Sequence, residues 1–214
     1  MPAASFDQST YQVRLEWGTA GLARLAPADI VVIVDVLRFS SRIVKALEGE
    51  VEYPLDDAAR ELSPTGVEIA LLAAEQTSSI ILLGALTNAS AVADAVLAAQ
   101  ARRRARTSVA IIAAGDRGSS RLDGDTRFAV EDFLGAGAII DALAAGGIDH
   151  TSPEAAAAGE SFAALRRALR HLLAASGSGR ELLAHGATAE VVDAAALNTS
   201  TIVPVLTNGV FRAL

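Results

Sequence analysis

The residue types that could do chemistry gather around Asp35-Val-Leu-Arg38 and the two serines that follow. The aliphatic run Ile30–Val34 comes directly before, so a carboxylate and a guanidinium stand where a buried strand should end. Arg38 could bind two oxygens of a phosphate or sulfonate. Ser40 and Ser41, with the free N–H groups of a helix start, could hold the same anion. Asp35 is a hard oxygen ligand suited to Mg²⁺. An anion or metal site is one interpretation, and a structural Asp35–Arg38 ion pair is the other.

A second acidic pair, Glu131-Asp132, lies in the segment RFAVEDFLGAGAIIDAL, which we expect to be helical. Adjacent residues of a helix point about 100° apart, so the two carboxylates would not share one face closely. One of them could reach a metal while the other stays in solvent. Taken alone, the pair is therefore better interpreted as a surface feature. Gly135 and Gly137, further along, suit close packing of this helix better than a dinucleotide site.

The elements that would position these residues alternate between aliphatic strands and helices. We expect strands at 11–17, 30–34, 51–55, 79–86, 108–114 and 202–206, and a turn at Thr207-Asn-Gly209. We expect helices at 42–47 with Ser40 or Ser41 as N-cap, at 67–75 after a turn at 64–66, from 89 to about 104, at 128–145 and through most of 151–196. This order predicts an α/β fold with a mixed, largely parallel sheet flanked by helices. Residues 1–214 would form one unit or two closely packed subdomains.

Polar residues also follow the later strands, with Asn88 after 79–86 and Gly115-Asp116 after 108–114. Ligands of open α/β sheets bind beyond the carboxyl ends of the strands. These residues would meet Asp35 only if the three strands are neighbours in the sheet, which the sequence leaves open.

Composition excludes several classes of function. The chain has no cysteine, which rules out thiolate nucleophiles and cysteine-ligated metals. Its net charge of −7, from 18 basic and 25 acidic residues, argues against a nucleic-acid partner. No apolar run approaches the roughly 20 residues that span a bilayer, and the N-terminus lacks the pattern of a signal peptide. We therefore expect a cytoplasmic protein with no membrane partner.

The order of several motifs resembles the 2-phosphosulfolactate phosphatase family. The motifs are VDVLRFSS, LGALTNASAVA, AIIAAG, AVEDFLGAGAIIDAL, GRELLAHG and VPVL, and the resemblance runs from about Trp17 to Leu206. It implies an α/β fold with a mixed sheet and Mg²⁺-dependent hydrolysis of a phosphate ester. The substrate named for the family is (R)-2-phospho-3-sulfolactate, on a route to coenzyme M.

The resemblance also implies roles for particular residues. Asp35 and Arg38 fall in the family's Asp-Val-Leu-Arg motif, Asn88 in its Asn-Ala element, and Glu131 and Asp132 in its Glu-Asp motif. This moves the Glu-Asp pair from the surface to the site. Together with the serines, the expected site has catalytic residues Asp35, Arg38 and Glu131, substrate-binding residues Arg38, Ser40, Ser41 and Asn88, and Mg²⁺ ligands Asp35, Glu131 and Asp132.

Two departures from the family keep a second function open. The family's Thr-Thr-Asn-Gly-Thr turn matches Ser63-Pro-Thr-Gly66-Val67 here, and an acidic element before VPVL is replaced by Leu197-Asn-Thr-Ser-Thr201. The first hypothesis is a Mg²⁺-dependent phosphatase acting on 2-phosphosulfolactate or a related 2-phospho acid. The alternative is a non-catalytic anion- or metabolite-binding protein. The alanine-rich helices expected between 154 and 175 suit either a homodimer face or packing within one chain.

Overall fold

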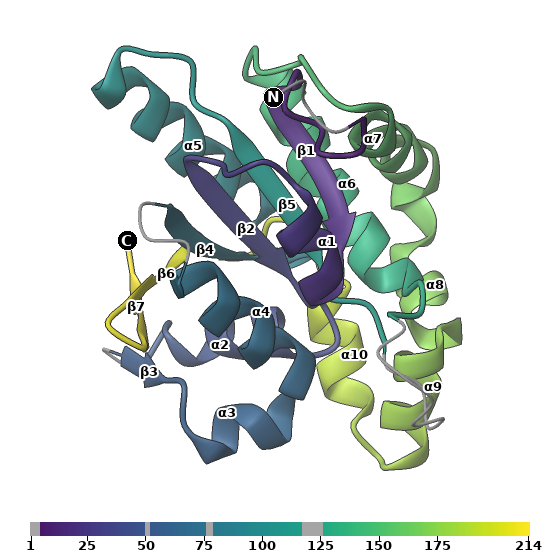
Figure 1. The fold of residues 1–214 in the computed structure, drawn as a ribbon. Helices are drawn as coiled ribbons and strands as arrows, with labels where there is room; N and C mark the ends of the chain where they lie inside the picture. Colours follow the sequence, from purple (N-terminus) through teal and green to yellow (C-terminus); the bar gives the residue numbers. More distant parts are fainter. Residues whose placement is uncertain (1–4, 50–51, 76–78, 117–125) are drawn as a thin grey trace.

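One mixed sheet organises the part of the chain that the structure describes. The computed structural model describes residues 5–49, 52–75, 79–116 and 126–214 (Figure 1). Within these ranges the strands lie in the order β1-β5-β2-β4-β6-β7-β3. The strands are β1 (Val13–Trp17), β2 (Ile30–Val34), β3 (Glu52–Pro54), β4 (Ile80–Gly84), β5 (Val109–Ala113), β6 (Pro204–Thr207) and β7 (Val210–Ala213).

The sheet divides into a parallel and an antiparallel half. β1, β5, β2 and β4 pair in parallel, whereas β6, β7 and β3 add antiparallel strands beyond β4. β2 is buried at every position because it has a neighbour on each side and helices on both faces. The predicted α/β fold with a mixed sheet is therefore confirmed.

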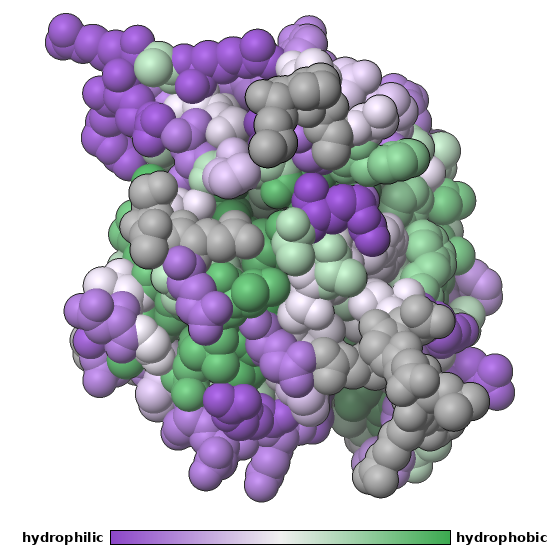
Figure 2. Space-filling view, in the orientation of Figure 1, coloured by the Kyte–Doolittle hydropathy of each residue, from purple (hydrophilic) through white to green (hydrophobic). Residues whose placement is uncertain are grey.

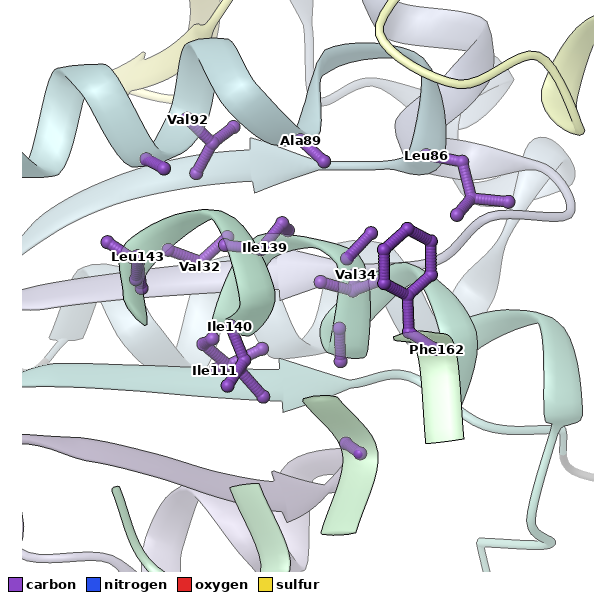
Figure 3. Close-up of a cluster of buried hydrophobic side chains, with 14 of the residues drawn as sticks. Val32, Val34, Leu86, Ala89, Val92, Ile111, Ile139, Ile140, Leu143 and Phe162 are labelled. Carbon is purple, nitrogen blue, oxygen red and sulfur yellow. The ribbon is translucent and has the colours of Figure 1, made fainter. Parts of the chain in front are cut away.

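Helices cover both faces of the sheet and divide the apolar core into two clusters. On one face of the sheet, Val32 and Val34 of β2 belong to a cluster with apolar residues of α5 and α6 (Figure 3). Residues of α7, α8 and α10 complete this cluster. Val31 and Ile33 point to the other face, where α1, α2 and α4 lie. The helices are α1 (Gly18–Arg24), α2 (Phe39–Ala46), α3 (Asp57–Leu62), α4 (Pro64–Glu75), η1 (Leu86–Asn88), α5 (Ala89–Arg103), α6 (Val130–Ala145), α7 (Pro153–Leu165), η2 (Arg166–Ala168), α8 (Leu169–Ala175), α9 (Gly177–Ala184) and α10 (Thr188–Ala194).

Two local predictions were wrong, and one helix was missed. α2 begins at Phe39 with Arg38 at the N-cap position, so Ser40 and Ser41 lie inside the helix rather than capping it. Residues 64–66 form the first turn of α4 instead of a separate turn, because proline is well tolerated at a helix start. α3 was not predicted at all. It starts with the side chain of Asp56 accepting a hydrogen bond from the Ala59 backbone.

The glycines of α6 allow close packing, as the sequence predicted. A Cβ atom at Gly137 would lie 2.2 Å from the backbone oxygen of Ala158 in α7. A Cβ at Gly135 would lie 2.6 Å from the Val36 side chain, just beyond β2. The first contact involves backbone that cannot rotate away, so the approach of α6 to α7 depends on Gly137.

Gly137→Ala should destabilise the protein by about 1–3 kcal/mol, since the new methyl group must push α6 away from α7. Urea unfolding monitored by circular dichroism would measure this loss. Gly49→Ala is the matched control, because nothing lies within 4 Å of a Cβ at that position. Equal midpoints for the two variants would contradict the packing argument.

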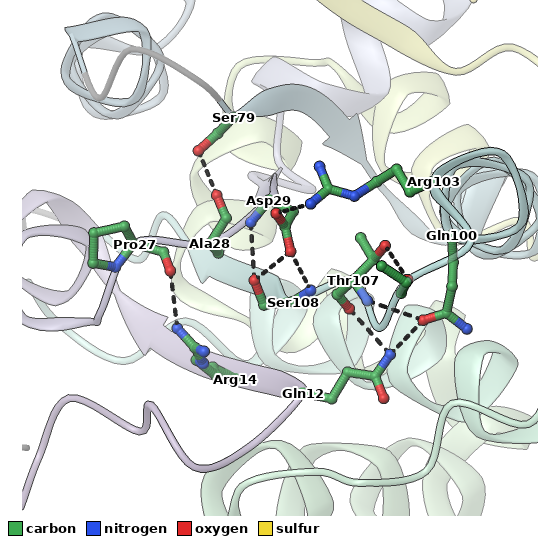
Figure 4. A network of polar contacts seen from close by, with 11 residues as sticks. Gln12, Arg14, Pro27, Ala28, Asp29, Ser79, Gln100, Arg103, Thr107 and Ser108 are labelled. Atoms are coloured by element: carbon green, nitrogen blue, oxygen red, sulfur yellow. Dashed lines mark hydrogen bonds and ion pairs between the residues drawn. The ribbon is translucent and has the colours of Figure 1, made fainter.

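A polar network joins the strands at their amino-terminal ends (Figure 4). Asp29, just before β2, accepts hydrogen bonds from the backbone N–H and hydroxyl of Ser108, at 2.7 and 2.8 Å, just before β5. Arg103 at the end of α5 pairs with the same carboxylate at 2.5 Å. Partial burial raises the pKa of Asp29, but the Ser108 hydrogen bonds and the Arg103 charge outweigh it, so the pKa lies below its ordinary value.

Asp29 should therefore contribute stability that depends on pH. A lowered pKa in the folded state means that the contribution is complete above the ordinary aspartate pKa and is lost as pH falls through the lowered value. Asp29→Asn should cost roughly 1–2 kcal/mol at pH 7, with the difference from wild type shrinking in acid. Urea unfolding across this range would measure it. Glu52→Gln, which removes an exposed partner of Arg212, should show no such trend.

The dense basic run of the sequence, within residues 101–106, lies on the surface at the end of α5. Hydrophilic side chains project from the end of α5 at the upper left of Figure 2, and residues 101–106 are exposed there. Arg102 and Arg103 lie in the last turn of α5, where cations interact favourably with the helix dipole. No helix among the described residues has the length and apolar character needed to cross a bilayer.

Candidate active site

The carboxyl ends of β2, β4 and β5 meet at one edge of the sheet. β2 lies between the other two strands, so the loops that follow all three are neighbours. The chain after β2 turns to the face of α2 and α4, whereas the chain after β4 turns to the opposite face as α5. Adjacent parallel strands that diverge in this way leave a crevice between their carboxyl ends, the usual ligand site of open α/β sheets.

Asp35 directly follows β2, and its side chain is held by two donors. Its Oδ2 accepts a hydrogen bond from the Ser63 hydroxyl at 2.6 Å, and its Oδ1 accepts one from the Phe39 backbone N–H at 3.2 Å. The Ser63 hydroxyl also accepts a hydrogen bond from the Gly66 backbone N–H in the first turn of α4. A Cβ atom at Gly66 would lie 2.6 Å from the Phe39 ring, so glycine lets α4 begin against Asp35.

Asp132, at the start of α6, links the loop after β2 to the loop after β5. Its Oδ1 accepts a hydrogen bond from the Val36 backbone N–H at 2.7 Å, and its Oδ2 accepts one from the Gly115 backbone N–H at 2.9 Å. Only 3% of Asp132 is exposed, and only 2% of its neighbour Glu131. The sequence interpretation that left one of the two in solvent was wrong. The Ser178 hydroxyl at the start of α9 donates a 2.5 Å hydrogen bond to Glu131 Oε1.

Burial and mutual repulsion govern the charges of this group, which we call the carboxylate cluster (Asp35, Glu131 and Asp132). Burial raises the pKa of Asp35, and the charge of Glu131 raises it further, against the hydrogen bonds from Ser63 and Phe39. Burial also raises the pKa of Asp132 well above its ordinary range, and the charges of Asp35 and Glu131 add to this effect. No salt bridge between described residues involves these carboxylates.

The carboxylate cluster suits a hard divalent cation by its chemistry. Its donors are all carboxylate oxygens, and its buried negative charges raise one another's energy, so a cation would stabilise it. Among the described residues, no group of three or more acidic or histidine side chains is arranged to hold a metal ion as it stands. Mg²⁺ usually takes only one or two protein carboxylates and keeps several waters. A pair drawn from the cluster would therefore suffice.

A cavity of about 600 Å³ is lined by the Val36–Arg38 loop, and none of the three carboxylates is among its lining residues. One wall is α2, and the other is formed by α10 and residues 196–200; Thr87 of η1 also lines it. The Ser41 hydroxyl and the Thr87 hydroxyl belong to the lining, and both oxygen atoms are buried with no hydrogen-bond partner among the described residues. Unpartnered buried hydroxyls are costly, so a ligand with polar groups would satisfy them.

Arg38, at the N-cap position of α2, and Arg42, one turn into the helix, both line this cavity. Both pair with Glu190 of α10: Arg38 at 3.3 Å and Arg42 at 3.5 Å. Arg38 therefore does not form the structural ion pair with Asp35 that was the alternative interpretation of the Asp-Val-Leu-Arg motif. Lys45, a further turn along α2, pairs with Asp193.

Ser40 and Asn88 are fully buried, and neither lines the cavity. The Ser40 hydroxyl accepts a hydrogen bond from the Asp35 backbone N–H and donates one to the Ile33 carbonyl. The Asn88 side chain accepts from the Ala85 backbone N–H and donates to the carbonyls of Leu83 and Ile202. In this structure the two side chains fix the ends of β2 and β4, in contrast to the substrate contact that we expected from the sequence.

Comparison with known proteins assigns the chain to a family. The family model described as 2-phosphosulpholactate phosphatase matches residues 62–209, more than half of the 214-residue chain. The chain belongs to the 2-phosphosulpholactate phosphatase family. The predicted resemblance is thereby confirmed. No match was found among curated proteins.

The family match covers part of the site and leaves part outside. Glu131, Asp132 and Glu190 lie within residues 62–209, whereas Asp35 and Arg38 precede them. The family is one of phosphatases, which supports a phosphatase for this member. The assignment of Asp35 and Arg38 to a site is a prediction from the sequence motif.

Several residues of this phosphatase-family site were not anticipated from the sequence. Arg42 could have been found, because it lies one turn after Arg38 and so on the same face of a helix. Glu190 pairs with Arg38 across 152 residues of chain, and Ser178 reaches Glu131 across 47. No local pattern indicates contacts of that range.

Asp132→Asn should destabilise the protein by roughly 1–3 kcal/mol, because an amide has only one oxygen for the two buried N–H groups of Val36 and Gly115. Chemical unfolding would measure the loss. Asp141→Asn, further along α6 and only partly buried, is the control and should change stability by less than about 0.5 kcal/mol. A neutral Asp132→Asn variant would contradict the role of Asp132 in holding the two loops.

Proposed function

We propose that the protein is a Mg²⁺-dependent phosphatase of a small acidic phosphate monoester, 2-phosphosulfolactate or a related 2-phospho acid. The observation that carries the proposal is the position of Arg38. Arg38 lines the cavity, while Asp35 of the same short motif belongs to the carboxylate cluster. Membership of a phosphatase family supports the reaction class.

The cavity side of the site would bind the phosphate ester. The guanidinium of Arg38 can donate two parallel hydrogen bonds to phosphoryl oxygens, which orients the group as well as attracting it. The unpartnered hydroxyls of Ser41 and Thr87 would donate to other oxygens of the ligand. Apolar walls from Val44 and Ala194 leave the cavity suited to a small acid rather than to a long polar chain.

The carboxylate cluster would hold the metal. Two of its members would bind Mg²⁺, which when present neutralises negative charge on the phosphoryl oxygens. Asp35 would be one of these ligands, oriented by its hydrogen bonds from the Ser63 hydroxyl and the Phe39 backbone N–H. Asp132 holds the Val36 and Gly115 N–H groups and so keeps the Val36–Arg38 loop in place.

A non-catalytic anion-binding protein is the second candidate. In its favour, both Asp35 oxygens and both Asp132 oxygens already accept hydrogen bonds from the protein. The cavity with Arg38 and the free hydroxyls would serve such a protein equally well. Metal-dependent turnover separates the two candidates, because binding alone needs the cavity but not the carboxylates.

Phosphate release from 2-phosphosulfolactate and a panel of 2-phospho acids, with Mg²⁺ or with EDTA, tests the proposal. We expect Mg²⁺-dependent turnover. Asp35→Asn and Arg38→Gln should each lower kcat/KM by about 100-fold or more, as loss of a transition-state contact does. Arg212→Gln is the matched control, because Arg212 pairs with Glu52 on the antiparallel half of the sheet, and it should retain full activity.

Two results would count against the phosphatase. Turnover that survives both Asp35→Asn and Arg38→Gln would place the reaction elsewhere. No turnover of any ester by the folded wild-type protein, together with measurable phosphate binding, would favour the anion-binding candidate.

A further inference from the structure

The start of α9 brings one hydroxyl to the carboxylate cluster. Ser178, the second residue of α9, donates a 2.5 Å hydrogen bond to Glu131 Oε1 across 47 residues of chain. The Ser176 hydroxyl caps this helix by accepting a hydrogen bond from the Gly179 backbone N–H at 3.1 Å. The position of Ser178 is therefore set by a capped helix start.

Glycines on both sides of Ser178 let this helix start lie close to its neighbours. A Cβ atom at Gly179 would lie 1.8 Å from the Leu173 carbonyl oxygen at the end of α8. A Cβ at Gly177 would lie 2.9 Å from Arg127 Nη1, just before α6. The first contact is with backbone that cannot rotate away, so a larger residue at position 179 would displace α9. The Gly-Ser-Gly sequence thus fixes the place from which the Ser178 hydroxyl reaches the cluster.

The oxygens of the carboxylate cluster are not equally engaged. Asp132 offers both oxygens to backbone N–H groups, at 2.7 and 2.9 Å, and these hydrogen bonds hold the loops after β2 and β5. Asp35 also has a donor on each oxygen, but one is the Ser63 hydroxyl, which can rotate, and the other bond is longer, at 3.2 Å. Among the described residues, Glu131 Oε1 accepts from Ser178 and its Oε2 accepts from no donor. Glu131 is only 2% exposed, so Oε2 also has little access to water.

A poorly solvated carboxylate oxygen of this kind suits a hard cation. The neighbouring charges of Asp35 and Asp132 add repulsion that a cation would relieve. Asp132 would have to share oxygens that already hold two loops, whereas Glu131 can offer Oε2 and keep Oε1 on Ser178. A hydrogen bond to the other oxygen of a ligating carboxylate orients it and tunes its affinity for the metal.

We propose that Ser178 is a positioning residue: it holds Glu131 Oε1 and so leaves Oε2 as the oxygen that binds the metal, with Asp35 as the other carboxylate ligand. Asp132 then serves the fold and is not a ligand. This inference rests on the proposed function, in which the carboxylate cluster holds Mg²⁺. It adds a residue of α9 to the site and gives the two acids of the Glu-Asp pair separate tasks.

Binding of Mn²⁺, followed by electron paramagnetic resonance, tests the inference without any measurement of turnover. Mn²⁺ takes the same kinds of oxygen ligand as Mg²⁺. Ser178→Ala should weaken Mn²⁺ binding by about tenfold or more, the usual effect of removing a group that orients a metal ligand. Ser178→Thr keeps the hydroxyl and should restore most of the affinity, which a purely structural role of Ser178 would not predict. Ser161→Ala is the matched control, because this partly buried serine of α7 is not a donor to the cluster, and it should leave the affinity unchanged.

Glu131→Gln and Asp132→Asn separate the tasks of the two acids, because each variant removes one negative charge from the cluster. Glu131→Gln should weaken Mn²⁺ binding more than Asp132→Asn does. Asp132→Asn should instead lower the stability in urea and retain measurable metal binding. Circular dichroism establishes that each variant is folded before it is titrated.

Equal Mn²⁺ affinity of Ser178→Ala and wild type overturns the positioning role, and so does a Ser178→Thr variant that binds as weakly as Ser178→Ala. A greater loss of affinity in Asp132→Asn than in Glu131→Gln overturns the division of tasks. These outcomes leave the proposed function standing if the wild type binds metal and hydrolyses esters. A folded wild-type protein that binds neither Mn²⁺ nor Mg²⁺ would instead remove the metal from the proposed function, and this inference with it.

Discussion

The site depends on one buried carboxylate with two backbone partners. Asp132 accepts hydrogen bonds from Val36 and Gly115, which stand immediately beyond two neighbouring parallel strands. Burying this charge is costly, and the raised pKa of Asp132 reflects that cost. The two N–H groups offset it, and in return they are themselves satisfied away from water. The start of α6 is thereby fixed against the sheet, and Glu131, the preceding residue, is carried into the interior beside Asp35.

The loop from Val36 to Arg38 joins the two parts of the site. The Val36 backbone N–H binds Asp132 of the carboxylate cluster, and all three residues of the loop line the cavity. Because β2 leads to α2 on one face and β4 leads to α5 on the other, the crevice at this point is a property of the topology. Asp35 and Arg38 belong to different parts of the site although they are close in sequence.

The family match and the structure cover different parts of the site. Residues 62–209 include the Glu-Asp pair, α9 and α10, whereas the Asp-Val-Leu-Arg motif lies before the matched segment. Contacts join the two parts: Ser63 donates a hydrogen bond to Asp35, and Glu190 pairs with Arg38. The 63–67 segment, which departs from the family pattern, lies against Asp35. Ser63 still reaches Asp35 and Gly66 still permits the close approach of α4, although Pro64 turns the segment into a helix start.

The sequence by itself determined the elements with strong local patterns. The uniformly aliphatic β2 has the predicted bounds, Asn208 and Gly209 form the predicted turn with positive φ angles, and Gly137 packs closely as expected. It also predicted that Asp35 directly follows a buried strand, and β2 does end at Val34. Only the tertiary structure decided that β4 and β5 flank β2. It also decided which polar side chains are buried: Glu131 and Asp132 of α6, together with Ser40 and Asn88. The ion pair between Glu190 and Arg38 likewise forms only in the folded protein. The physical reason is range: strand propensity, turns and glycine contacts within a helix act over a few residues, whereas these pairings join segments from different parts of the chain that meet only when the sheet has formed.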